Sequence, residues 1–290
     1  MKTTALKMPA YFISHGGGPW PWLQAEMPGV YDNLEASLRD MALQLGTTPK
    51  AVLMVSGHWE ERDFTVMSSP QPGMIYDYSG FPAFTYQIKY PAPGSPEVAR
   101  RVQELLRGSG LAVSADDRRG FDHGTFAPLK AIYPEADVPA LELSIRNDYD
   151  PEAHIAVGRA LAPLRDEGVL IVGSGLSYHN LRRFGAAGVH PSREFDTWLT
   201  EAVCGLVGQE RSGKLHGWTA APSARLAHPD EDHLIPLMVA VGAAEDESGV
   251  RVYHEASFFG GLTVSSYRFG HAIGSRNSVT DIPRQENDNG

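Results

Sequence analysis

Histidines follow several apolar runs of this 290-residue chain and carry its clearest chemical signal. His15 follows Ala10–Ser14 and precedes three glycines, and His58 lies in SGHWE after the run AVLMVS. His179 follows VLIVG through a short turn, and His233 stands in PDEDHLIPLMVA just before an apolar helical pattern. If the runs are neighbouring parallel strands, their carboxyl ends open on one crevice, where α/β proteins bind ligands. Convergent imidazoles in such a crevice predict a metal site.

The competing interpretation is structural. A single histidine after a strand is often an ordinary hydrogen-bonded loop residue, and only the combination of His15, His58, His179 and His233 favours metal binding. His228 is close to His233 in the sequence, and its role stays open. We interpret His154, His190, His216, His254 and His271 as surface or packing residues.

A fifth histidine has a different setting. His123 lies in the turn Asp122-His123-Gly124, just before an apolar helical pattern. Because free imidazole titrates near ~6.5, such a position suits a proton-transfer residue. The alternative is that this segment is simply a helix-capping turn, with Asp122 or Thr125 as the cap.

The elements that must position these residues alternate along the chain and predict one α/β domain, a three-layer fold with a central mixed, mostly parallel sheet flanked by helices. The domain is expected to span residues 8–270, with a polar tail over 271–290. The expected strands are Ala10–Ser14, Ala51–Ser56, Phe64–Ser68, Val138–Ile145, Val169–Gly173, Val250–Glu255 and Leu262–Phe269. The expected helices are Val30–Leu45, Pro96–Leu106, Phe126–Tyr133, Pro151–Leu164, Ser192–Val207 and Asp232–Ala243.

The composition of the chain argues against nucleic-acid binding and against a membrane-spanning helix. The formal net charge is −10, and no cluster of Lys and Arg provides the basic surface that nucleic acid needs. No run reaches the roughly 20 apolar residues of a membrane-spanning helix. The single cysteine, Cys204, cannot form an internal disulfide, and the N-terminus does not resemble a signal peptide, so we expect a cytoplasmic protein.

Other patterns are weaker. The segment Gly173-Ser174-Gly175 follows a strand but lacks the third glycine of a dinucleotide-binding loop, and Cys204 fits a buried hydrophobe better than a nucleophile. The segment Ser69–Gly94 is rich in proline and aromatics and predicts an ordered, functional loop. Its aromatics between Tyr76 and Phe84, together with Trp59, are candidates for stacking on an aromatic substrate.

Several segments together resemble a known family. In order along the chain they are SHGGG, SGHWE, YPAPGSPEVA, GFDHGTFAPLKAIYPEADVP, GSGLSYHNLR and PDEDHLIPLMVAVGAA. This combination resembles the class III extradiol ring-cleavage dioxygenases of the LigB superfamily, in particular the branch with the 4,5-DOPA extradiol dioxygenases. The sequence departs from the family pattern at two places. Three glycines follow His15, where many relatives have His-Gly followed by Ser or Thr and then Pro. His233 stands where the classical LigB branch supplies a glutamate that completes an iron site of two histidines and one carboxylate.

The resemblance implies roles for the histidines. His15, His58 and His233 correspond to metal ligands, and His123 to an acid/base residue. His179 corresponds to a fourth ligand in the DOPA branch and to an acid/base residue in the LigB branch, and both roles stay open. Fe(II) is the metal expected for activity, while a set of imidazoles binds Zn(II) equally well.

The implied reaction is the extradiol cleavage of a small catecholic substrate by O₂. We expect no nucleic-acid or membrane partner, and the oligomeric state stays open. Two other functions remain as alternatives. One is a zinc hydrolase that uses the same histidines, and the other is a non-catalytic binding protein like the distantly related Memo proteins.

Overall fold

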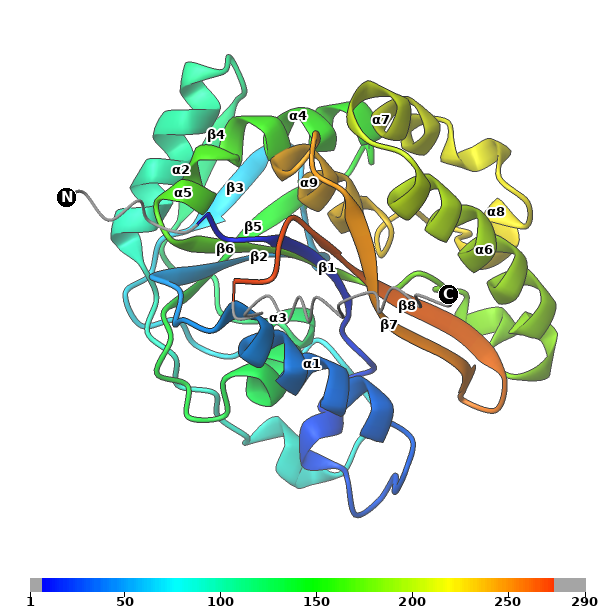
Figure 1. Ribbon diagram of the computed structural model, residues 1–290. Helices are drawn as coiled ribbons and strands as arrows, with labels where there is room; N and C mark the ends of the chain where they lie inside the picture. Colours follow the sequence, from blue (N-terminus) through cyan, green and yellow to red (C-terminus); the bar gives the residue numbers. More distant parts are fainter. Residues whose placement is uncertain (1–6, 274–290) are drawn as a thin grey trace, which may run out of the picture.

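The computed structural model describes residues 7–273 and shows one eight-stranded mixed sheet between layers of helices (Figure 1). The strands are β1 (Ala10–Ser14), β2 (Ala51–Glu61), β3 (Phe64–Met67), β4 (Val113–Asp116), β5 (Ala140–Arg146), β6 (Val169–Gly175), β7 (Gly249–Phe258) and β8 (Leu262–Phe269). Their order is β4-β3-β5-β2-β6-β1-β8-β7. Parallel pairing joins β1 to β6, β6 to β2, β2 to β5 and β3 to β4. The predicted fold class is therefore confirmed.

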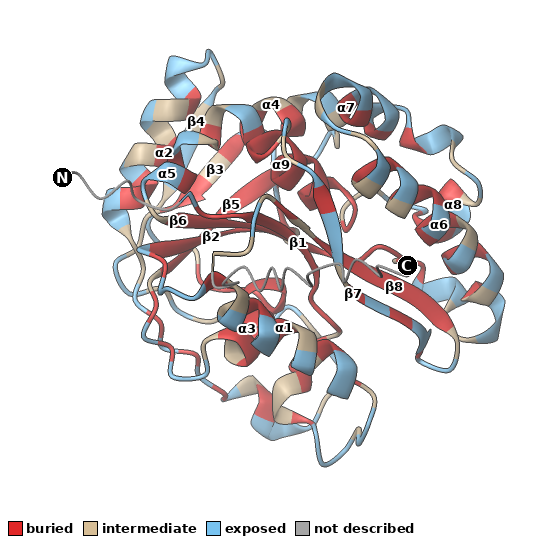
Figure 2. Ribbon diagram, viewed as in Figure 1, coloured by how far each residue is buried: buried red, intermediate tan, exposed pale blue. Residues whose placement is uncertain are grey.

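Helices cover both faces of the sheet. They are α1 (Asp32–Leu45), α2 (Pro96–Gly108), α3 (His123–Ile132), α4 (Pro151–Leu161), α5 (Pro163–Asp166), α6 (Val189–Gly205), α7 (Gly208–His216), α8 (Ala224–Ala227) and α9 (Ile235–Ala243). In Figure 1, α1 and α3 lie on one face and α4 and α9 on the other. The central strands are almost wholly buried between these layers, and α9 is itself buried along its whole length (Figure 2). This double cover explains why the central strands read as continuous apolar runs.

The pairing register places the expected ligand strands at one edge. Ser14 at the end of β1 lies opposite Gly175 at the end of β6, and Ser56 on β2 lies opposite Ser174. Parallel pairing therefore points the carboxyl ends of these three strands toward the same side of the sheet. His15, His58 and His179 all follow or lie near those ends.

Some boundaries differ from the expected ones. Strand β2 does not end at Ser56, because it continues through His58 to Glu61 after a register irregularity between Val55 and Glu60. The predicted helix Pro151–Leu164 ends at Leu161, and Pro163 begins the separate helix α5, as expected for a residue that cannot continue a hydrogen-bonded helix. Strand β4 and the helices α7 and α8 were not predicted.

The ends of the chain are only partly described. Most of the predicted tail, residues 274–290, lies outside the described residues. Within residues 7–273, no helix combines the length and the apolar character needed to cross a membrane.

Candidate metal centre

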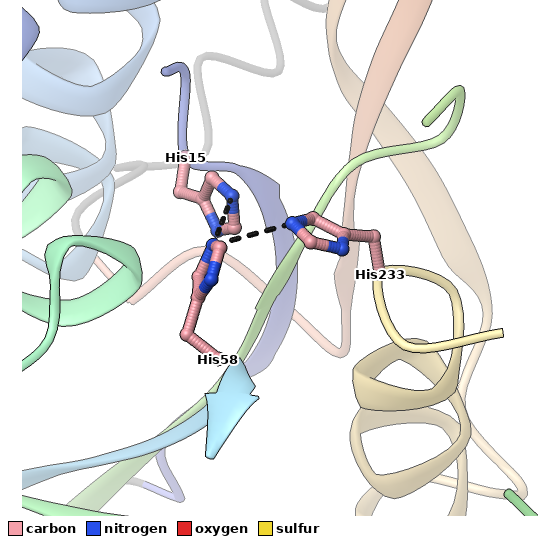
Figure 3. A group of neighbouring side chains, drawn as sticks. All are labelled: His15, His58 and His233. Atoms are coloured by element: carbon pink, nitrogen blue, oxygen red, sulfur yellow. Dashed lines mark hydrogen bonds between the residues drawn. The ribbon is translucent and has the colours of Figure 1, made fainter. Parts of the chain in front are cut away.

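Three imidazoles meet at the carboxyl edge of the sheet (Figure 3). The Nε2 atom of His58 lies 3.3 Å from Nε2 of His15 and 3.2 Å from Nε2 of His233. His15 and His233 are buried, at 1% and 3% exposed, while the side chain of His58 is partly buried, at 20% exposed. Two ligand nitrogens bound about 2.0–2.1 Å from a tetrahedral ion would be about 3.3 Å apart. The observed spacing therefore fits a shared metal ion.

The hydrogen bonds behind the rings leave lone pairs facing one another. Ser174 donates its only hydroxyl proton to the carbonyl oxygen of Gly124, so its oxygen accepts the Nδ1–H of His15 at 3.1 Å. His233 donates Nδ1–H to Asp232 Oδ2 at 2.7 Å. The Nε2 atoms of His15 and His233 therefore both carry lone pairs toward His58 Nε2. The Nε2 atom of His58 can donate a hydrogen bond to only one of these two nitrogens, which leaves the lone pair of the other without a partner. A cation between the rings would accept the lone pairs of all three nitrogens.

Electrostatics keeps the three rings in the neutral form that binds metal. Burial, followed by the neighbouring histidines, holds the pKa of His15 and His233 well below the ordinary range. Burial, and next the adjacent His123, lower the pKa of His58 to about 4. Burial works to raise the pKa of Asp232, but the facing imidazoles of His179 and His233 outweigh it, so this pKa lies below its ordinary value. Asp232 therefore remains an acceptor.

The loop that carries His233 is held by a close backbone approach. The carbonyl oxygen of His233 accepts the N–H of Leu176 at 3.1 Å, just beyond β6. A Cβ atom at Gly175 would collide with this same carbonyl oxygen. A glycine at the end of β6 thus lets the His233 loop pack directly on the strand.

His179 lies beside the three converging rings. Its ring stacks on His233 with centroids 3.4 Å apart, and its Nδ1 lies 3.8 Å from Asp232 Oδ1. Its ligand atom groups with those of Asp232 and His233, and this group shares His233 with the group of His15, His58 and His233. Both of its predicted roles are therefore compatible with its position on the cavity wall.

His123 is held from outside the metal group. It begins α3, and its Nδ1 lies 2.9 Å from Asp77 Oδ2, while its backbone N–H donates to Asp77 Oδ1 at 3.0 Å. The rings of His58 and His123 have centroids 4.0 Å apart. Burial opposes ionisation of Asp77, but the hydrogen bonds that its carboxylate accepts from His123 prevail and lower the pKa of Asp77. Since the carboxylate accepts Nδ1–H, the Nε2 of His123 is left as a proton acceptor.

A buried ionic network supports the turn before His123. Asp122 occupies the N-cap position of α3, but its side chain makes no capping bond. Its carboxylate instead accepts Ser56 Oγ–H at 2.8 Å and Arg119 Nη2–H at 2.7 Å. Glu142 Oε1 accepts the backbone N–H of Asp122 at 3.0 Å. This network, rather than a capping bond, ties the turn to β2 and β5.

Several sequence expectations about the cavity wall need correction. Trp59 is a buried core residue and does not line the cavity. Of the aromatics between Tyr76 and Phe84, Phe81 lines it. His228 is fully buried away from the three rings and donates Nε2–H to the carbonyl oxygen of Ser177 at 3.0 Å.

Two important residues were missed. Asp77 and Asp232 orient histidines, yet each depends on tertiary contacts. Two features of the sequence could have indicated them. Asp232 directly precedes His233, and Asp77 lies in the long loop Ser69–Gly94 that was expected to be functional. Cys204 is partly buried in α6, and burial raises the pKa of its thiol, which does not favour a nucleophile.

Comparisons with known proteins agree with this geometry. Residues 9–270 match the family described as the catalytic LigB subunit of aromatic ring-opening dioxygenase. The chain is 45% identical to a "4,5-DOPA dioxygenase extradiol" of Beta vulgaris, over 89% of this chain and 95% of that protein. A second protein of that name, from Portulaca grandiflora, is 38% identical over 90% and 95% of the two chains.

A solved structure has the same fold. The crystal structure of the uncharacterized protein JW3007 from Escherichia coli K12 is similar with a TM-score of 0.73 and 31% identity, covering 91% of this chain and 100% of that one. The chain therefore belongs to the LigB family of class III extradiol dioxygenases, a family of oxygenase enzymes.

Proposed function

We propose that this protein is an Fe(II)-dependent extradiol dioxygenase that opens the aromatic ring of a catecholic substrate with O₂. The carrying observation is the convergence of three Nε2 atoms in a cavity of about 560 Å³ that is also lined by His123 and His179. The names of the relatives support the reaction class. In this proposal His15, His58 and His233 hold the metal, which supplies the electron transfer between the aromatic ring and O₂.

The protein's own residues manage protons. Asp77 holds the Nδ1–H of His123, so Nε2 of His123 accepts a proton from a catechol hydroxyl as the substrate binds. The same nitrogen returns that proton to an oxygen of the substrate as the ring opens. His179, stacked on His233, is the second candidate for proton transfer, and Asp232 keeps both rings in place.

The metal and the reaction are tested together. Metal-free protein is loaded anaerobically with Fe(II) or, as the matched control, with Zn(II), and is then mixed in air with protocatechuate, DOPA and uncharged catechols. We expect O₂ uptake and a yellow ring-opened product with iron only, because zinc has no redox chemistry. Iron-loaded protein without O₂ uptake on any catechol would contradict the proposal and favour the zinc hydrolase or the binding protein.

A further inference from the structure

The glycines that follow His15 form part of the cavity wall. Gly16, Gly17 and Gly18 all line the cavity beside the His15 ring. A Cβ atom at Gly17 would lie only 3.0 Å from the phenol oxygen of Tyr31, which comes directly before α1 and lines the same cavity. Because Gly17 has no side chain, the hydroxyl group of a distant residue lies against the backbone that carries His15.

The ring of Tyr31 is held in a fixed position relative to His15. Trp20 is 1% exposed and donates its Nε1–H to the carbonyl oxygen of His15 at 2.7 Å. Tyr31 stacks on Trp20, with ring centroids 5.0 Å apart. Phe258 and Phe259 meet the Tyr31 ring edge to face, at 5.8 and 5.6 Å between centroids. These contacts hold the phenol hydroxyl at one place on the cavity wall.

The hydroxyl of Tyr31 is a donor without an acceptor. Burial raises the pKa of this phenol more than the backbone N–H of Gly17, which faces its oxygen, lowers it, so the proton stays on the oxygen at neutral pH. In the part of the chain that the structure describes, residues 7–273, no group accepts this proton. Tyr31 is only 6% exposed, and nearly buried donors are normally satisfied by protein, water or a ligand. The hydroxyl is therefore available to a ligand oxygen in the cavity.

We infer that Tyr31 is a substrate-binding residue whose hydroxyl donates a hydrogen bond to a ring oxygen of the catechol. This inference rests on the proposed function and adds a residue to the same site. A catechol that has given a proton to His123 carries negative charge on oxygen, and such an oxygen accepts stronger hydrogen bonds than a neutral one. Tyr31 keeps its own proton, so it binds and orients the substrate, while Gly17 and Trp20 position the hydroxyl.

Tyr31→Phe removes the hydroxyl but keeps the ring that stacks on Trp20. Catechol and DOPA are titrated calorimetrically into the zinc-loaded protein, which we expect not to turn them over. Both dissociation constants should rise about 10–100-fold, as expected for the loss of a hydrogen bond to a charged oxygen. Equal factors for the two ligands are expected because they share the ring oxygens. The affinity for Zn²⁺, measured against a chelator, should stay unchanged.

Tyr133→Phe is the matched control. Among the described residues the phenol oxygen of Tyr133 likewise has no hydrogen-bond partner, but it is buried outside the cavity. Removing this hydroxyl should leave the affinities for both ligands unchanged.

Gly17→Ala tests the position of the hydroxyl. The added Cβ atom would press on the phenol oxygen of Tyr31, while the φ of Gly17 lies outside the left-handed region and suits alanine. Gly73→Ala is the matched control, because a Cβ atom there meets nothing within 4 Å. We expect Gly17→Ala to weaken the binding of both ligands and Gly73→Ala to leave it unchanged. In the Tyr31→Phe background, Gly17→Ala should add little, because the hydroxyl that it displaces is already absent.

The outcomes separate the inference from the proposed function. The inference is overturned if Tyr31→Phe binds both ligands as tightly as Tyr133→Phe, if only the affinity for DOPA falls, or if zinc-loaded wild-type protein binds neither ligand. A weaker affinity of Tyr31→Phe for Zn²⁺ would also overturn it, since Tyr31 would then act on the metal. If the iron-loaded wild-type protein consumes no O₂ with any catechol while Tyr31→Phe weakens binding as expected, the proposed function fails and the inferred hydrogen bond stands.

Discussion

Asp232 offers the sharpest test of how the protein prepares the metal ligands. Its Oδ2 accepts Nδ1–H of His233 at 2.7 Å, a charge-assisted hydrogen bond to a ring that is 3% exposed. Asp232→Asn keeps the shape of the side chain but removes its charge. A hydrogen bond to a charged group is worth about 1.5–3 kcal/mol. At about 1.4 kcal/mol per factor of ten, the variant should bind metal roughly 10–100-fold more weakly, the range typical for partners of ligating histidines.

The assay is a competition between protein and a chelator for Zn²⁺ at constant pH. Asp230→Asn is the matched control, because this carboxylate lies in the same loop but is exposed. We expect the control to retain nearly all of the affinity. If Asp232→Asn binds Zn²⁺ as tightly as Asp230→Asn, the carboxylate does not prepare His233 for a metal, and the reasoning is refuted.

Two further predictions concern other histidines. His123→Ala should keep its metal, as measured by elemental analysis. Its turnover, measured as O₂ uptake, should fall about 10²–10⁴-fold, because the variant lacks the proton acceptor that Asp77 orients. Unchanged turnover would exclude proton transfer by His123. His154 is buried far from the site as a neutral ring, and burial lowers its pKa from 6.5 to about 4. Because the unfolded chain takes up a proton on His154 at a higher pH than the folded protein does, the stabilisation from His154 is complete above pH 6.5 and is lost as the pH falls toward 4. Between pH 7 and pH 5, His154 therefore lowers the free energy of unfolding by about 2 kcal/mol. Chemical denaturation of His154→Gln should show a fall smaller by that amount, and an identical pH dependence in both proteins would contradict the prediction.

The fold could be predicted where local pattern and burial agree. The apolar runs Ala10–Ser14 and Leu262–Phe269 form strands with the predicted bounds, because their residues pack on both faces. Strand β4 was missed because none of its four residues is buried and they lack a hydrophobic pattern. Strand β2 extends past Ser56 because pairing with β5, a tertiary interaction, resumes at Glu60.

The candidate site could be predicted only in part for the same reason. His15 follows the apolar run of β1 and His58 follows the apolar run Ala51–Ser56 of β2, and parallel pairing of both strands with β6 brings the two histidines together. Asp77 reaches His123 from a loop 46 residues earlier in the chain, and no local pattern indicates this contact. The network of Asp122 and Glu142 likewise joins segments that periodicity alone cannot connect.

The most direct measurement is the fate of molecular oxygen labelled with oxygen-18. Iron-loaded protein is mixed under ¹⁸O₂ with a catechol that it cleaves in the O₂-uptake assay, and the ring-opened product is analysed at once by mass spectrometry, with His58→Ala as the control for the metal site. A dioxygenase that uses His15, His58 and His233 should place both labelled atoms in the product, and His58→Ala should form none. A ring-opened product that lacks the label, and so took its oxygen from water, or full activity in His58→Ala, would contradict a dioxygenase built on these three histidines.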